Sequence, residues 1–244
     1  MIEIKDLAFS YKEKEVLKNI SFAADAGDIL AILGKNAVGK TTLINVLTGL
    51  LEAQAGNIFI CGEDTTKKLT ETIKSKIGVM RPIVGVFEKM TCLQYLEFVA
   101  GLYGISRAKI LELSEKYQFS SELTRMIKKC STGTRKKVEF CAAIIHDPLV
   151  LFLDEPFESV DPVVVSEIKE YIRNFSKNGR TILITSHILD IVQNICTKYI
   201  IIDNGTVVHS GEIANSTPSA NDVTELERIL LETVNGNEKE PSIT

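Results

Sequence analysis

The fold of this chain is decided by the stretch Gly34-Lys35-Asn36-Ala37-Val38-Gly39-Lys40-Thr41-Thr42. An apolar run over residues 29–33 precedes it and is long enough for a buried strand. After it, apolar residues at 43, 46 and 47 continue with helical spacing. The stretch matches the pattern G-x4-G-K-[ST] and has the strand, glycine-rich loop and helix context that this pattern requires. We therefore predict a phosphate-binding loop here.

The chemistry of such a loop follows from its backbone. Gly34 and Gly39 allow turns that a side chain would block, so that successive N–H groups point at one anion-sized hollow. The start of the following helix adds its unpaired N–H groups and the positive end of its dipole. We expect Lys40 to reach the β- and γ-phosphates of a nucleotide and the Thr41 hydroxyl to bind Mg²⁺. The whole stretch 34–42 is predicted to contact the nucleotide.

Composition narrows the classes of protein that are possible. The chain has 244 residues, of which 45% are hydrophobic and 25% charged, which is enough for a sizeable core. A net charge of −4 gives no basic surface for nucleic acid. The five cysteines are scattered without a C-x-x-C pair, which indicates reduced thiols in a cytosolic protein. No apolar run approaches the roughly 18 residues of a membrane span, so a membrane role is expected to come through a partner.

The first part of the chain is predicted to form short antiparallel strands around the loop. Ile2 and Ile4 begin one strand, residues 16–22 form its hairpin partner, and residues 56–62 form another strand. From about residue 90 to 143 the spacing becomes helical. Thr91-Cys92-Leu93-Gln94 matches a capping box ahead of an apolar stripe over residues 95–103. Further helices are expected over 108–117 and 137–145, so we predict a helical subdomain inserted at about 88–146.

The second part of the chain alternates between strands and helices. Residues 149–153 form a continuous apolar run, typical of a central strand buried on both faces. We expect a helix over 163–175, a strand over 181–185, a helix over 188–196 and a hairpin that turns at Asn204-Gly205. A last helix over 223–234 and a disordered tail should follow. This order predicts an α/β fold with a parallel central sheet and an N-terminal antiparallel β subdomain, in a domain of residues 1–215 with a separate segment over 216–244.

An Asp-Glu pair directly follows the predicted central strand. Asp154 should lie at the carboxyl end of that strand, beside the phosphate loop of a parallel sheet. Because Mg²⁺ prefers hard oxygen ligands and keeps several waters, Asp154 and Thr41 suffice to hold it. Glu155 points elsewhere and could polarise an attacking water, since phosphoryl transfer depends mostly on positioning and charge neutralisation. An acidic turn that caps the next helix is the alternative.

The order and spacing of these motifs resemble the ATP-binding cassette of ABC transporters over about residues 1–211, including Leu153-Asp154-Glu155-Pro156 and Ser186-His187. The resemblance implies a P-loop NTPase core, ATP and Mg²⁺ as ligands, and Glu155 and His187 as catalytic residues. It also implies a dimer, with a second copy of the chain or a related cassette, around two ATP molecules. Such a dimer drives a separate membrane permease, so the chain would be cytoplasmic and peripheral on the inner face of the membrane. The helical stretch from residue 87 looks most like exporters of the drug, antibiotic or lipid type.

Three further motifs take their roles from this resemblance. Tyr11 resembles the aromatic residue that stacks on adenine, although an exposed turn tyrosine is the alternative. The segment Cys130-Ser131-Thr132-Gly133-Thr134 stands where the family carries Leu-Ser-Gly-Gly-Gln. Ser131 and Gly133 should therefore hold the γ-phosphate of ATP bound to the other protomer, unless Ser131 is only a helix N-cap. Asp161 resembles part of the loop that lines the dimer seam.

One segment departs from the family. The last position of Ile77-Gly78-Val79-Met80-Arg81-Pro82 is normally a Gln that touches Mg²⁺ and senses the γ-phosphate. Pro82 has no side-chain donor or acceptor, so no such role is assigned; Arg81 is one substitute and a water the other. Residues 84–89 are the expected docking surface for the permease. Pro82 and Thr132 favour a regulatory ATP-binding module as an alternative function. A non-transport ABC-type ATPase fits less well, because those carry a long coiled-coil insert or tandem cassettes.

Overall fold

The computed structural model describes residues 1–158, 160, 162–213 and 228–229. Its N-terminal sheet is antiparallel, with strand order β2-β1-β4-β5. The first two strands form the predicted hairpin. The strands are β1 Ile2–Tyr11, β2 Lys14–Ala24, β4 Ala55–Ile60 and β5 Glu63–Asp64. The N-terminal antiparallel sheet expected from the sequence is thus present.

The second sheet carries the strand that leads into the phosphate loop. Its order is β10-β9-β3-β8-β7-β6, and every neighbouring pair is parallel except β9 with β10. The strands are β3 Ile29–Leu33, β6 Ile77–Met80, β7 Val150–Asp154, β8 Thr181–Ser186, β9 Lys198–Asp203 and β10 Thr206–Glu212. The hairpin between the last two turns at Asn204 and Gly205, both with positive φ, as predicted. The central sheet is therefore parallel apart from this edge strand.

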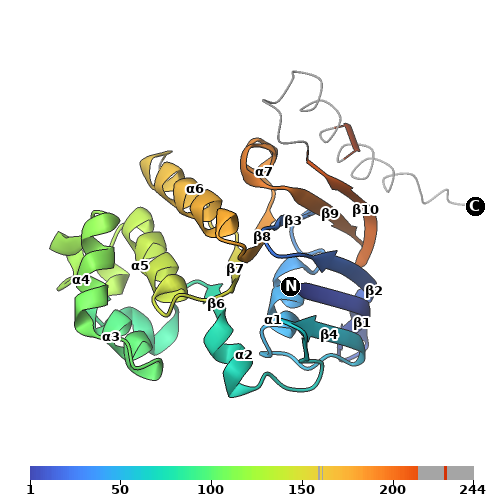
Figure 1. Cartoon of the computed structure of the whole chain (residues 1–244), viewed down its shortest axis with the longest axis horizontal. Helices are drawn as coiled ribbons and strands as arrows, with labels where there is room; N and C mark the ends of the chain where they lie inside the picture. Colours follow the sequence, from blue (N-terminus) through green and yellow to red (C-terminus); the bar gives the residue numbers. More distant parts are fainter. Residues whose placement is uncertain (159, 161, 214–227, 230–244) are drawn as a thin grey trace, which may run out of the picture.

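Helices surround the second sheet and form most of the other half of the molecule (Figure 1). They are α1 Lys40–Leu47, α2 Glu71–Lys76, α3 Cys92–Leu102, α4 Arg107–Lys116, α5 Thr132–Ile144, α6 Pro162–Lys177 and α7 Leu189–Ile195. Short 3₁₀ helices η1 Gly85–Lys89, η2 Ser120–Glu122 and η3 Ile127–Lys129 join them. Helices α3, α4 and α5 stand between β6 and β7 in the chain. The predicted capping box at Thr91 is formed, with Gln94 completing it.

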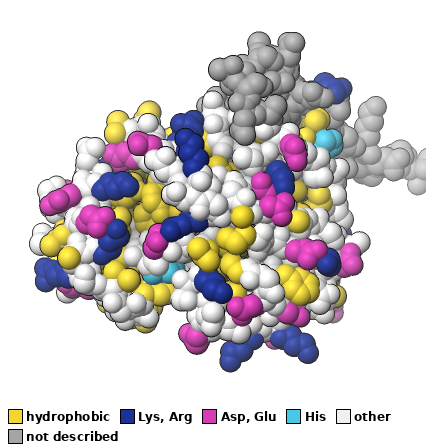
Figure 2. Space-filling model, viewed as in Figure 1, with side chains coloured by type: hydrophobic (Ala, Val, Ile, Leu, Met, Phe, Trp, Pro, Cys, Tyr) yellow, Lys and Arg dark blue, Asp and Glu magenta, His cyan; other side chains and the backbone are white. Residues whose placement is uncertain are grey.

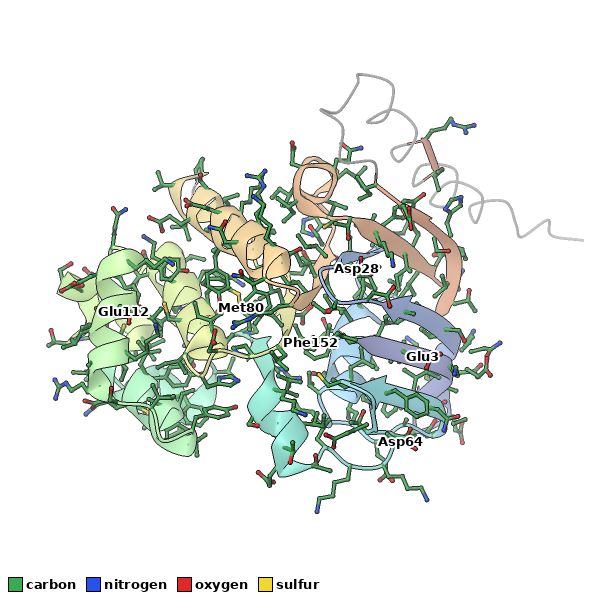
Figure 3. The ribbon with its side chains drawn as sticks, viewed as in Figure 1. Glu3, Asp28, Asp64, Met80, Glu112 and Phe152 are labelled. Carbon is green, nitrogen blue, oxygen red and sulfur yellow. The ribbon has the colours of Figure 1, made fainter. Side chains whose placement is uncertain are left out.

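The central strand β7 separates two apolar cores. Leu151 and Leu153 belong to the core shared with α3 to α6, whereas Val150 and Phe152 belong to the core shared with α1 and the antiparallel sheet. Figure 3 shows Met80 toward α5 and Phe152 toward the antiparallel sheet. Burial on both faces explains the continuous apolar run and fixes the carboxyl end of β7 beside that of β8.

Three predictions about the elements need correction or fall outside the described residues. Helix α5 begins at Thr132, earlier than predicted, because Ser131 caps it. The stripe predicted for α3 is only partly buried, since Phe98 and Leu102 are exposed. The predicted helix over 223–234 and the tail after it lie outside the described residues, apart from Arg228 and Ile229.

Candidate nucleotide site

The phosphate loop connects β3 to α1, and two glycines make its path possible. A Cβ atom on Gly34 would lie 2.4 Å from the carbonyl oxygen of Ile202, which no side chain tolerates. Gly39 has φ 112°, and a Cβ there would come within 3.0 Å of the Leu17 side chain. Ala37 also adopts a positive φ, 65°, which is unfavourable for a residue with a side chain. The loop is thus held in a strained shape with α1 opening directly behind it.

Lys40 lies across the loop. Its side chain is 6% exposed, and Nζ donates hydrogen bonds to the carbonyl oxygens of Gly34 at 2.7 Å and Lys35 at 3.2 Å. The same Nζ lies 3.5 Å from Oε1 of Glu155. A buried cation requires such partners because its desolvation is costly. The loop carbonyls and the carboxylate therefore hold one positive charge at the mouth of the loop.

Asp154, at the end of β7, joins two threonine hydroxyls. Thr185 Oγ1 donates to Asp154 Oδ1 at 2.6 Å, and Thr41 Oγ1 donates to the same oxygen at 3.3 Å. Thr41 comes from the start of α1 and Thr185 from β8. The parallel sheet thus brings Thr41 and Asp154 together as expected, and it adds Thr185, which sequence reasoning missed. A hydroxyl and a carboxylate are hard oxygen ligands of the kind that Mg²⁺ prefers. Thr41 and Asp154 fit a magnesium ion.

Glu155 is held at both its backbone and its carboxylate. Its backbone φ is 45°, its N–H donates to Thr185 Oγ1 at 2.8 Å, and its carbonyl accepts from Lys136 Nζ at 3.2 Å. Its carboxylate lies between Lys40 and His187, with Nδ1 of the histidine 3.1 Å from Oε2. Strained backbone of this kind persists only where the surroundings fix it. The structure thus places both predicted catalytic side chains in direct contact.

A cleft of about 500 Å³ opens beside these groups. Tyr11, Glu155 and most of the predicted phosphate loop border it, but Gly34, Lys35 and Val38 do not. Its walls are Tyr11, Lys14, Val16, Asn36, Ala37, Gly39, Lys40, Thr41, Thr42, Glu155 and Glu158. Tyr11 packs edge-to-face on Phe9 and is half exposed to the cleft and solvent. Sequence reasoning missed Lys14 and Val16, because the register of the β1–β2 hairpin places them there.

The predicted signature residues lie apart from this cleft. Ser131 is the N-cap of α5: its Oγ accepts from the Thr134 N–H at 3.1 Å and shares a hydrogen bond with the Thr134 hydroxyl at 2.9 Å. Neither Ser131 nor Gly133 borders the cleft. Asp161 lies outside the described residues. Within one chain, the residues predicted for the site therefore fall into two separate groups: those at the cleft, and Ser131 with Gly133 at the start of α5.

The residues on either side of Pro82 are held by contacts with the end of α1 and with α5. Arg81 hydrogen-bonds to the Thr48 hydroxyl at the end of α1, and burial lowers the pKa of its guanidinium. Pro82 is exposed. The next residue, Ile83, donates its N–H to Glu139 Oε1 at 3.0 Å, deep in α5. Burial raises the pKa of Glu139. Sequence reasoning missed this contact because a single Glu in a helix does not show which face it occupies.

A separate groove of about 580 Å³ runs between the helices and the N-terminal sheet. Residues from the end of α1, from the segment before α2, and from α3 and α5 line it, including Leu51, Tyr95, Val99 and His146. Figure 2 shows apolar side chains along this seam. Leu50, which lines the groove, is exposed, and so are four other large apolar side chains, Val84, Val86, Phe98 and Leu102. Within the described residues no helix is both long and apolar enough to cross a bilayer.

Comparison with known proteins gives one consistent result. Residues 17–158 match the family described as ABC transporter. The chain is 32% identical over 222 residues to the ABC transporter ATP-binding protein NatA of Bacillus subtilis, covering 87% of this chain and 90% of the relative. It is 28% identical to the lantibiotic transport ATP-binding protein SrtF of Streptococcus pyogenes, covering 88% and 93%. A solved nucleotide-free ATP-binding cassette from an ABC transporter superimposes with a TM-score of 0.82 at 24% identity, covering 96% and 98%.

Proposed function

The chain belongs to the ABC transporter family as an ATP-binding subunit, and from this premise we propose that it hydrolyses ATP to drive a separate membrane permease. The observation that carries the proposal is the contact of the Glu155 carboxylate with both Lys40 and His187 at the edge of the cleft. A carboxylate in this place can orient a water for attack, while cationic and polar groups stabilise the charge that develops on the phosphate.

The roles of the individual side chains follow from their positions. Lys40 places its charge where the β- and γ-phosphates meet the loop, and the N–H groups at the start of α1 add to it. Thr41 and Asp154 would hold Mg²⁺, which when bound neutralises phosphate charge. Glu155 accepts a proton from the attacking water, and His187 orients the carboxylate. Tyr11 offers its ring as a stacking surface for the base.

The proposed site is completed by a second chain. Ser131 and Gly133 open α5 but lie off the cleft, so the N–H groups of that helix start have no phosphate of their own chain to bind. We propose that two copies, or this chain and a related cassette, place them against ATP held in the other's phosphate loop. Two ATP molecules then lie at the seam, and hydrolysis reopens the dimer.

The proposed partner is a membrane permease, with the chain on the inner face of the membrane. The groove beside α3 and the exposed Val84 and Val86 support a docking surface for an amphipathic segment of that partner. Export is the proposed direction, because SrtF is named for lantibiotic transport and shares 28% identity with this chain. The transported molecule would contact the permease and not this chain.

A regulatory module that binds ATP with little turnover is the second candidate. Pro82 stands in place of a glutamine and Thr132 in place of a glycine, and both weaken the groups that sense the γ-phosphate. The presence of Lys40, Asp154 and Glu155, in contact with one another or with Thr41 at the cleft, argues against a module that only binds ATP.

The substitution Glu155→Gln separates the two candidates. It keeps the size of the side chain and removes its ability to accept a proton. We expect ATP hydrolysis by the purified chain to fall by about 10²-fold or more, with ATP binding retained. Unchanged turnover in the variant, or no turnover in the unmodified chain, would favour the binding module. Hydrolysis and equilibrium ATP binding are measured on the same preparations.

A further inference from the structure

Helix α5 carries two neighbouring lysines that are both nearly buried but meet different parts of the molecule. Lys136 is 13% exposed and Lys137 is 12% exposed. Lys137 pairs with Glu167 of α6 at 3.2 Å, which fastens two helices together. Lys136 instead reaches the end of β7, where Nζ donates to the carbonyl oxygen of Glu155 at 3.2 Å. Of these two lysines, therefore, only Lys136 contacts the backbone of Glu155, the proposed catalytic residue.

Lys136 also faces a buried acid. Glu139 is 6% exposed, and its Oε2 lies 3.7 Å from Lys136 Nζ. Among the described residues this oxygen has no hydrogen-bond partner. The positive charge of Lys136 therefore offsets the cost of burying the negative charge of Glu139. The other carboxylate oxygen, Oε1, accepts the N–H of Ile83 at 3.0 Å. A buried carboxylate is costly unless it is paired in this way, so Glu139 restrains both Lys136 and Ile83.

We propose that Lys136 is a positioning residue for ATP hydrolysis, which fixes the Glu155 backbone and, through Glu139, ties it to the segment that follows Pro82. The inference deepens the proposed function and rests on it. Each link is a direct contact between described residues: the Ile83 N–H with Glu139, Glu139 with Lys136, and Lys136 with the Glu155 carbonyl. The path joins the predicted docking segment to the hydrolytic side chain.

The Glu155 backbone is the sensitive end of this path. Its φ of 45° is unfavourable for a residue with a side chain. Three hydrogen bonds hold it there: its N–H donates to Thr185, and its carbonyl accepts from Lys136 Nζ at 3.2 Å and from the N–H of Glu158 at 3.3 Å. Loss of the Lys136 contact would let the peptide relax and would move the carboxylate relative to Lys40 and His187. A displacement of about 1 Å at a reacting group costs on the order of 10²-fold in rate.

Pro82 gives this path its particular importance. A side chain at position 82 cannot report on the phosphates, because proline has neither donor nor acceptor. The next residue, Ile83, is buried and its N–H is bound by Glu139. Movement of the docking segment can therefore reach Glu155 through the buried Glu139 and Lys136. A double-mutant cycle tests the coupling along this path.

The first experiment compares Lys136→Met with Lys137→Met in the full chain. Each removes a buried charge from α5 at an adjacent position, so both should lower the thermal unfolding temperature. Only Lys136→Met should lower kcat for ATP hydrolysis, by about tenfold or more, with KM and ATP binding within about twofold of the unmodified chain. Lys136→Arg, which keeps a cationic donor, should recover most of the lost kcat. Equal kcat losses in the two Met variants would overturn the proposal and indicate a merely structural role.

The second experiment tests the link to Ile83. Glu139→Gln keeps an acceptor for the Ile83 N–H and removes the charge that holds Lys136. We expect its kcat to fall as in Lys136→Met, and the double variant to lose no more than either single one. Strictly additive losses, or an unchanged kcat in Glu139→Gln, would overturn the path. A chain whose unmodified form hydrolyses no ATP would instead overturn the proposed function itself.

Discussion

The cleft and the signature segment, residues 130–134, differ in where their polar groups find partners. In the cleft, Lys40 and Thr41 at the start of α1 meet Glu155 and Asp154 at the carboxyl end of β7. In the signature segment, the Ser131 side chain hydrogen-bonds to Thr134 within its own helix start and to nothing else among the described residues. Polar side chains that converge from distant parts of the chain are typical of a binding site. A cap within one helix start is found in any helix and by itself does not indicate binding. The difference teaches that one chain assembles the cleft by itself, and it supports the proposal that the signature segment acts on a nucleotide held by a second chain.

The largest effect should come from the cleft. Lys40→Ala removes the charge that the loop carbonyls and Glu155 surround, so phosphate binding and transition-state stabilisation are both lost. We expect ATP hydrolysis to fall by about 10²- to 10³-fold. Lys74→Ala is the control, because Lys74 is an exposed lysine that pairs with Glu71 and does not border the cleft. Hydrolysis that survives Lys40→Ala would show that phosphate is bound elsewhere.

A smaller loss is expected from the signature segment. Ser131→Ala removes the N-cap oxygen and the proposed ligand of the partner's γ-phosphate. Hydrolysis should fall by about tenfold, and the free energy of unfolding by about 1 kcal/mol. Mg²⁺-dependent ATPase assays and urea unfolding measure the two effects.

Mixing the two defective chains sharpens this comparison. A dimer of Lys40→Ala with Ser131→Ala has one intact site, formed by the loop of one chain and the signature segment of the other. Random pairing should therefore restore about a quarter of the unmodified activity. A mixture no more active than its components would contradict a site shared between chains.

The remaining prediction concerns the stability of the phosphate loop and not its chemistry. Gly39→Ala should lower the free energy of unfolding by about 2 kcal/mol, because φ is 112° and Leu17 and Val16 crowd the new Cβ. Ala37→Gly should leave it within about 0.5 kcal/mol, since relief at φ 65° is offset by a more flexible unfolded chain. Urea unfolding curves distinguish these outcomes. A stable Gly39→Ala variant would mean that the loop can relax without cost.

Local patterns predicted most of the cleft. The glycine-rich stretch lies between a strand and a helix as expected. Residues 150–153 before Asp154 are buried as predicted, whereas Leu149, at the start of the predicted run, is exposed. These features can be predicted from the sequence because they depend on residues that are close together in the chain and on the periodicity of a single helix or strand. The capping box at Thr91 was predictable for the same reason.

Contacts between distant elements were not predictable. The strand β6 was missed because Gly78 interrupts its apolar pattern, and the structure shows why glycine is there: a Cβ would lie 2.1 Å from the Ala143 carbonyl oxygen of α5. Lys136 and Glu139 looked like ordinary charged residues of a helix. Their burial depends on how α5 packs against β6 and the end of β7, which a single sequence does not reveal.

The central claim is that two chains close around ATP held in the cleft. The most direct test is the mass of purified Glu155→Gln by light scattering, with and without ATP and Mg²⁺. The account predicts a monomer without ATP and a dimer with it, because the slowed hydrolysis keeps the closed form populated. A monomer under both conditions, in a variant that demonstrably binds ATP, would contradict a site completed by a second copy of this chain.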